Sequence, residues 1–219
     1  LLENAIVHDC DHNGIIADML GTTDIVSCQS YSNGVSGLDI STDPILPFRN
    51  HVIGGIYRNN VQFGVRVSKA RHVDLLGVTA EVNGNNGASP LDGFCILDSD
   101  DISLIGCDSR ENYRAGIIAD GCTRIKITDC TAMNNDEAAD INGDGIVFVD
   151  TLNSHIMGCK IYDNNVAPTQ NRAIITSGTS DYNVIIGNDI GAHATTPLVS
   201  WVGTHNKINS NTGYPTESH

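Results

Sequence analysis

GFCILDSDDISLIGCDSREN (residues 93–112) and GIIADGCTRIKITDCTAMNN (residues 116–135) can be written one under the other in register. Each begins with a glycine and a short apolar strand that ends at a polar turn. A second apolar strand follows, then a Gly-Cys or Asp-Cys pair, and each segment ends in asparagine. The glycine lies 14 residues before the cysteine in both copies. Short strands repeated in this way, without helical periodicity, predict an all-β repeat protein.

The same template extends over most of the chain. Glycines that open apolar strands recur every 23–29 residues, at Gly14, Gly37, Gly64, Gly93, Gly116 and Gly145. Self-similarity of this period indicates a solenoid in which each repeat contacts its neighbours. We predict a right-handed parallel β-helix of about eight coils over residues 1–210, with a C-terminal tail or the start of a linker at 211–219. Leucine-rich repeats fit less well because LxxLxLxxN is missing, and a β-sandwich would not keep one template in register over six segments.

Two further features fit this fold. The length of the repeat varies between the asparagine and the next glycine, most at residues 83–91 and 136–143, which predicts loops along one side of the solenoid. The cysteines of the shared column are expected to be buried as small apolar residues, with Cys10 beside them: Cys28, Cys107, Cys130 and Cys159. Since no CxxC motif occurs, no residue is assigned to a metal.

Charge and hydropathy exclude several kinds of partner. The 219 residues carry a formal net charge of −14, which argues against nucleic acid. No apolar run reaches the roughly 18 residues of a membrane span, so no membrane partner is expected. Because the chain begins at Leu1 without a secretory signal, we expect a processed or excised piece.

Charged residues are distributed unevenly along the chain. Residues 44–73 contain five Lys or Arg and no Asp or Glu, which favours either a patch for an anionic ligand or an ordinary solvated face. At the polar turn after the first strand, Asp and Ser residues of successive repeats form a column, and most of them are expected to start the turn. The members are Asp18, Ser41, Ser68, Asp98, Asp120, Asp150 and Ser177. Carboxylates stacked one coil apart repel, so this column predicts either a raised pKa or a bound cation such as Ca²⁺.

Two stretches, VHDCDHNGIIADML (residues 7–20) and LPFRNHVIGGIYRNN (residues 46–60), together resemble the catalytic module of the secreted mannuronan C-5 epimerases. That family has His-Asp, four residues, then Gly-Phe-Val-Ala-Asp-Tyr-Leu, which this chain matches without a gap at His8, Asp9, Gly14, Ala17, Asp18 and Leu20. The resemblance covers residues 1 to about 110. It implies a β-helix enzyme that acts on an anionic polysaccharide, a polyuronate.

The resemblance also implies roles for residues. Asp18 inherits an active-site assignment, and His8 and Asp39 fall at groove positions. The epimerase reaction begins with abstraction of H5, the proton on the carbon next to the carboxylate, and requires no cofactor. The family's Tyr-Gly-Phe-Asp-Pro-His motif and its catalytic lysine are absent, so we expect that the upstream catalytic coil is missing and that this piece could be inactive alone.

The basic stretch supplies further substrate-binding candidates. Arg66 and Lys69 follow the strand-opening Gly64, so they are expected near the face that carries Asp18. Arg58 is a weaker candidate. Arginine pairs with carboxylates bidentately, and a row of such residues could bind successive uronate units.

Two other functions are compatible with the fold. Polygalacturonases, which are hydrolases of the same fold, use paired Asp residues together with Gly-His-Gly and Arg-Ile-Lys motifs. This chain has DSDD at residues 98–101 and RIK at 124–126, but it lacks Gly-His-Gly. The C-terminal NKINSNTGYPTESH (residues 206–219) resembles the end of phage tailspike β-helices, which bind or depolymerise cell-surface polysaccharides. The epimerase interpretation predicts a monomer and the tailspike interpretation a homotrimer. Both imply a location outside the cell or on the virion surface.

Overall fold

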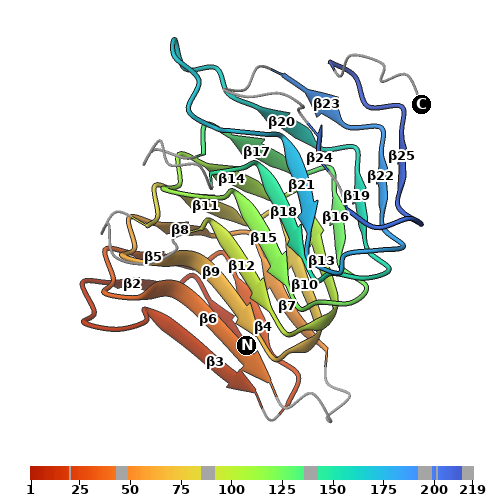
Figure 1. Cartoon of the computed structure of the whole chain (residues 1–219). Coiled ribbons are helices and arrows are strands. Elements are labelled where there is room, and N and C mark those ends of the chain that lie inside the picture. The colour runs from red at the N-terminus through yellow and green to blue at the C-terminus, as the bar shows by residue number, and fades with distance from the viewer. Residues whose placement is uncertain are drawn as a thin grey trace.

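The computed structural model describes residues 1–19, 21–42, 49–84, 92–135, 143–191, 199–200 and 202–213. These residues form strands and turns, without a helix, and the strands stack into three parallel sheets that wind about one axis (Figure 1). Each coil contributes one strand to each sheet in turn. The predicted all-β, right-handed parallel β-helix is therefore confirmed.

The three sheets are named here A, B and C. Sheet A contains nine of the described strands: β1 (Leu2–Glu3), β4 (Asp24–Val26), β7 (Asn50–Ile53), β10 (Arg71–Leu76), β13 (Asp100–Ile105), β16 (Lys126–Thr128), β19 (His155–Met157), β22 (Val184–Ile186) and β25 (Lys207–Asn209). Sheet B contains eight: β2 (Ile6–His8), β5 (Gln29–Tyr31), β8 (Ile56–Arg58), β11 (Thr79–Glu81), β14 (Asp108–Arg110), β17 (Thr131–Met133), β20 (Lys160–Tyr162) and β23 (Asp189–Ile190). Sheet C also contains eight: β3 (Ile15–Met19), β6 (Ser36–Thr42), β9 (Phe63–Ser68), β12 (Phe94–Leu97), β15 (Ile117–Asp120), β18 (Ile146–Val149), β21 (Ile174–Ser177) and β24 (Val199–Ser200).

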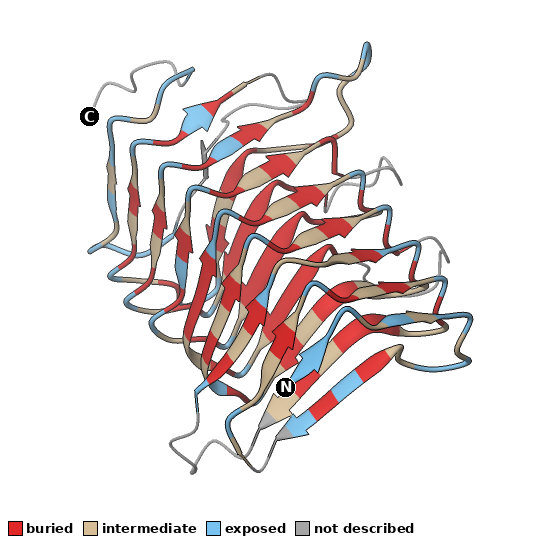
Figure 2. Ribbon diagram, turned by 180° about the vertical axis from the view of Figure 1, so that it is seen from behind, coloured by how far each residue is buried: buried red, intermediate tan, exposed pale blue. Residues whose placement is uncertain are grey.

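Alternation along each strand separates the core from the outer surface. In β15, Ile117 and Ala119 belong to the interior core, whereas Ile118 and Asp120 point outward. Inward residues of successive coils stack on one another because the parallel register places like positions opposite each other, as in the pairs Ile117–Ile146 and Ile146–Ile174. The resulting core runs through the solenoid as one cluster (Figure 2).

An asparagine ladder occupies the corner between sheets B and C. The side-chain oxygen of Asn112 accepts hydrogen bonds from both the backbone N–H and Nδ2 of Asn83, each at 3.0 Å. Asn112 repeats this pattern on Asn135, so the same bonds recur from coil to coil. The members are Asn33, Asn60, Asn83, Asn112 and Asn135, with Gln170 in the next position. The ladder satisfies buried backbone donors at a corner where no sheet does so.

The strand-opening glycines are required by this ladder. A Cβ atom on Gly116 would lie 2.6 Å from Nδ2 of Asn135, and one on Gly93 would lie 2.6 Å from Nδ2 of Asn112. Both contacts are far shorter than van der Waals separation. The glycine and asparagine columns of the sequence template are therefore two halves of one packed corner.

The cysteine column lies at the corner between sheets A and B. Cys28, Cys107, Cys130 and Cys159 are free and buried, as predicted. The thiol of Cys130 donates to the carbonyl oxygen of Leu104 at 3.4 Å. Cys10 does not lie beside them, which corrects the expectation: its N–H donates to Asn33 Oδ1, so it precedes the asparagine ladder.

Some predicted features lie outside the described residues. These are most of the loops at 83–91 and 136–143, residues 43–48, and residues 214–219 of the expected tail. Within the described part, Thr212 still forms a parallel bridge with Asp189, and β25 pairs with β22.

Candidate functional site

The first three strands of sheet C present a polar cluster on their outer surface. Outward positions of β3, β6 and β9 carry Asp18, Asp39 and Arg66, and the register places Asp39 directly between Ile16 and Arg66. Nη1 of Arg66 lies 3.4 Å from Oδ2 of Asp39, and Nδ2 of Asn13 donates to the same oxygen at 2.9 Å. This cluster is the candidate site.

The cluster is partly desolvated and incompletely hydrogen-bonded. Two of its buried atoms, Oδ1 of Asp39 and Nε of Arg66, have no hydrogen-bond partner among the described residues. Burial raises the pKa of the Asp39 carboxyl; Arg66 and Asn13 lower it, and the nearby Asp18 carboxylate raises it further. Buried donors and acceptors without partners are costly, and such costs are typical of functional sites.

Asp18 lies at the rim of this cluster. Its side chain is exposed, and the hydroxyl of Ser41, on the neighbouring strand, lies 3.4 Å from its Oδ1. Lys69 follows β9 in a left-handed turn, with φ of 51°, and its side chain is exposed at the corner that leads to sheet A. Asp18, Asp39 and Arg66 are therefore brought together, and Lys69 lies at the edge of the same face.

His8 and Arg58 lie on a different face. They occupy outward positions of β2 and β8 in sheet B, on either side of Tyr31. The His8 ring stacks on Tyr31 with centroids 5.0 Å apart, the Arg58 guanidinium lies 5.6 Å from the Tyr31 centroid, and Arg58 pairs with Glu81 at 3.7 Å. The structure thus separates these two candidates from Asp18.

The predicted column of Asp and Ser divides into two columns. Asp18, Ser41, Ser68, Asp120 and Ser177 occupy equivalent outward positions of sheet C. Asp98 and Asp150 lie one residue further along, in left-handed turns with φ of 47° and 46°, where they are turn-forming residues. Among the described residues, no group of three or more His, Cys, Asp or Glu side chains is arranged to hold a metal ion, and the Ca²⁺ expectation stays a prediction.

Electrostatic repulsion is nevertheless present at Asp120. Burial raises the pKa of this carboxyl, and the Asp150 and Asp98 carboxylates raise it further. In contrast, hydrogen bonds from the backbone N–H and hydroxyl of Thr179 lower the pKa of Asp150.

We expect the Asp120→Asn variant to melt about 1–2 °C above the wild type at pH 7 and at the same temperature as the wild type near pH 3. Because the folded state raises the pKa of Asp120, this residue favours folding at pH values below its ordinary pKa of 3.8. The contribution is lost as the pH rises through the folded-state pKa. Thermal melts followed by circular dichroism between pH 3 and 7 measure this difference. A variant less stable than the wild type at pH 7 would contradict it.

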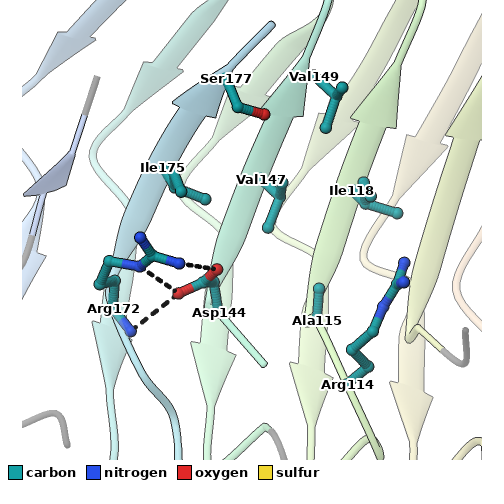
Figure 3. Close-up of a pocket in the computed structure, with 9 residues that line it drawn as sticks. All are labelled: Arg114, Ala115, Ile118, Asp144, Val147, Val149, Arg172, Ile175 and Ser177. Carbon is teal, nitrogen blue, oxygen red and sulfur yellow. Dashed lines mark hydrogen bonds and ion pairs between the residues drawn. The ribbon is translucent and has the colours of Figure 1, made fainter. Parts of the chain in front are cut away.

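Further along sheet C, a pocket of about 220 Å³ lies outside the predicted site (Figure 3). Arg114 pairs with the fully buried Asp92, both contacts at 2.9 Å, and Arg172 pairs with the buried Asp144 at 2.9 and 3.2 Å. The sequence carries a signal for these pairs that the prediction missed. An Asp stands directly before the strand-opening glycines Gly93 and Gly145, and Arg114 stands two residues before Gly116.

Comparison with known proteins identifies the fold family. The model of the family described as right handed beta helix region matches residues 1–190. No curated protein sequence matches the chain. Within the described residues, no helix has the length and apolar character needed to cross a membrane.

Several solved structures share this fold. The A-module of mannuronan C-5 epimerase AlgE6 from Azotobacter vinelandii superimposes with a TM-score of 0.84 at 15% identity, over 99% of this chain and 58% of that one. For the AlgE4 A-module of the same organism the TM-score is 0.78 at 19% identity, over 94% and 57%. The ORF18 protein of Geobacillus virus E2 gives 0.53 at 14% identity, over 96% and 53%. This chain therefore spans little more than half of each of these structures, and the likeness is one of fold.

Proposed function

The chain belongs to the right-handed β-helix family, and we propose that it binds an anionic polysaccharide on the outer face of sheet C and acts there in the manner of a mannuronan C-5 epimerase. The observation that carries the proposal is the Asp39–Arg66 pair, with one donor and one acceptor left without partners on an outward face. The sequence resemblance and the fold shared with two epimerase A-modules support it. A polysaccharide substrate of this kind implies an extracellular location.

The chemistry of uronate epimerisation assigns a role to each member of the cluster. Loss of H5 leaves an electron pair that delocalises into the substrate carboxylate, so that group must be neutralised. Arg66 can do this with its guanidinium charge; Asp39 holds that guanidinium in place, and Asn13 in turn holds the Asp39 carboxylate. Asp18, at the exposed rim, is the proposed proton-transfer group, and a second group must return a proton to the opposite face of C5.

The double variant Arg66→Ala, Lys69→Ala tests the binding face. We expect its affinity for polymannuronate to fall about tenfold, with a flatter dependence on salt, because two cations that face the polyanion are removed. Isothermal titration at two salt concentrations measures both effects. The charge-matched control is Lys126→Ala, Lys160→Ala, which removes exposed lysines from sheets A and B.

Unchanged binding by the Arg66 and Lys69 variant would remove the binding-face assignment. The alternative is a module that grips a cell-surface polysaccharide as part of a phage appendage; it rests on the resemblance of residues 206–219 to the end of phage tailspikes, and one viral protein shares the fold. Analytical ultracentrifugation separates the two: the epimerase proposal expects a monomer, and a stable trimer would favour the appendage.

A further inference from the structure

The outer face of sheet C becomes apolar beyond the polar cluster. Cys95, Ile118 and Val147 point outward from β12, β15 and β18, yet they are only 4–9% exposed. They form a hydrophobic cluster separate from the interior core. Outward positions of sheets A and B in the same coils include charged residues such as Lys126 and Asp108, with isolated apolar ones such as Ile105. This part of sheet C is therefore a distinct apolar surface on the outside of the solenoid.

The pocket described above lies on this surface. Ile118, Val147 and Ile175 form its floor, and Arg114 and Arg172 flank it at the end where the strands begin (Figure 3). The side chain of Ile175 points outward from β21 and is partly buried against the apolar cluster. A ligand in this pocket would contact carbon atoms below and guanidinium groups at one end.

The polar groups of the pocket are mainly donors. Both oxygens of Asp144 are engaged by Arg172, through its backbone N–H at 3.0 Å, Nε at 2.9 Å and Nη2 at 3.2 Å. The third guanidinium nitrogen of Arg172 points away from Asp144, to the side of Ile175 (Figure 3). The pocket therefore suits a group that accepts hydrogen bonds, has none to donate and carries an apolar end. A free sugar hydroxyl would instead have to donate to Ser177 or to a carboxylate oxygen of Asp144 that already accepts from Arg172, since the described side chains of the floor are apolar.

We propose that this pocket binds an O-acetyl group carried by the polysaccharide, an inference that rests on the proposed function above. The ester carbonyl accepts from Arg172, and the methyl group packs on Ile118, Val147 and Ile175. An acetyl ester meets each requirement because it is acceptor-only and ends in a methyl group. The polar cluster around Arg66 then binds the carboxylates of the polysaccharide, and this pocket binds its acetyl esters.

The test compares O-acetylated polymannuronate with the same sample after mild alkaline deacetylation, by isothermal titration. We expect the wild type to bind the acetylated polymer about fourfold tighter for each methyl group buried. Ile175→Phe fills the pocket and should bring the ratio to about one. Val149→Phe repeats the test from the neighbouring strand. Ile105→Phe, at an exposed outward position of sheet A, is the control that keeps the wild-type ratio.

Each outcome bears on a stated part of the inference. Equal affinity of the wild type for both polymers overturns the acetyl pocket and leaves the proposed function intact. A ratio that survives both phenylalanine variants, each with a wild-type circular dichroism spectrum, also overturns the pocket. Failure of the wild type to bind either polymer overturns both proposals.

Discussion

Asn112→Ala is expected to lower the free energy of unfolding by about 3–5 kcal/mol. The Asn112 side chain accepts from the N–H and Nδ2 of Asn83 and donates to the carbonyl oxygen of Ala80 at 3.1 Å and to Oδ1 of Asn135 at 3.0 Å. Alanine removes these four bonds and a fifth, which Nδ2 donates to Oγ of Ser109 at 3.1 Å. The groups left without partners are buried, and each costs about 1–3 kcal/mol when no water can reach it. Urea unfolding followed by circular dichroism measures the loss.

Asn164→Ala is the matched control for this prediction. The Asn164 side chain is exposed, so its removal should change the free energy of unfolding by less than about 0.5 kcal/mol. If Asn112→Ala were as mild as the control, the ladder would be a consequence of the fold and not one of its main supports.

Asp18→Asn is expected to lower the rate of H5 exchange on polymannuronate at least about a hundredfold, which is the usual contribution of a proton-transfer side chain. Asparagine keeps the shape of the side chain but cannot accept the proton as a carboxylate does. Folding should be preserved because Asp18 is exposed and makes only a weak 3.4 Å contact with Ser41. Proton NMR of the polymer follows the reaction.

Ser41→Ala serves as the control, since it removes the hydroxyl near Asp18 and leaves the carboxylate in place. A melting temperature that falls sharply in Asp18→Asn would identify the residue as a turn-forming group. Full activity in that variant would remove Asp18 from the proposed mechanism.

The coil structure could be predicted because several signals agree at each position of the repeat. The glycine and asparagine columns are in direct steric contact, as at Gly116 and Asn135, so the position of one column in the repeat fixes the position of the other. Alternation within the strands then assigns inward and outward residues. Asp39 and Arg66 each lie two residues after a strand-opening glycine, and equal distances from the glycine give equal positions in neighbouring coils. The sequence assigned Arg66 to the face of Asp18 from Gly64, whereas Asp39 was assigned to the groove through the family resemblance.

Other residues were misplaced for a reason that the structure makes clear. Asp18 and Asp120 lie four residues after their glycines, whereas Asp98 and Asp150 lie five residues after theirs. A shift of one residue along the chain moves a side chain from the outer face of the strand into the turn. An alignment that places both spacings in one column therefore combines residues from two different environments. His8 precedes Gly14 by six residues, which puts it on the preceding strand in sheet B.

The pocket could not be anticipated from the strand pattern. Outward residues such as Ile118 and Val147 are apolar, so the runs that contain them resemble strands buried on both faces. Only the corner pairs, Arg114 with Asp92 and Arg172 with Asp144, show that this outer surface is flanked by fixed guanidinium groups. Each of these Asp residues stands before an opening glycine and is visible in the sequence, but its partner lies 22 or 28 residues away, and the register is needed to assign it.

The asparagine ladder also has an evolutionary consequence. Each rung offers the same acceptor to the coil below and the same donor to the coil above, so any rung can stand next to any other. A gene segment that encodes one complete turn could therefore be duplicated or deleted in frame without creating an unmet hydrogen bond at the junction. Proteins of this fold can lengthen or shorten their outer faces in whole-turn steps, and the proposed ligand, a polymer with a repeating chemical structure, matches a surface that grows in this way.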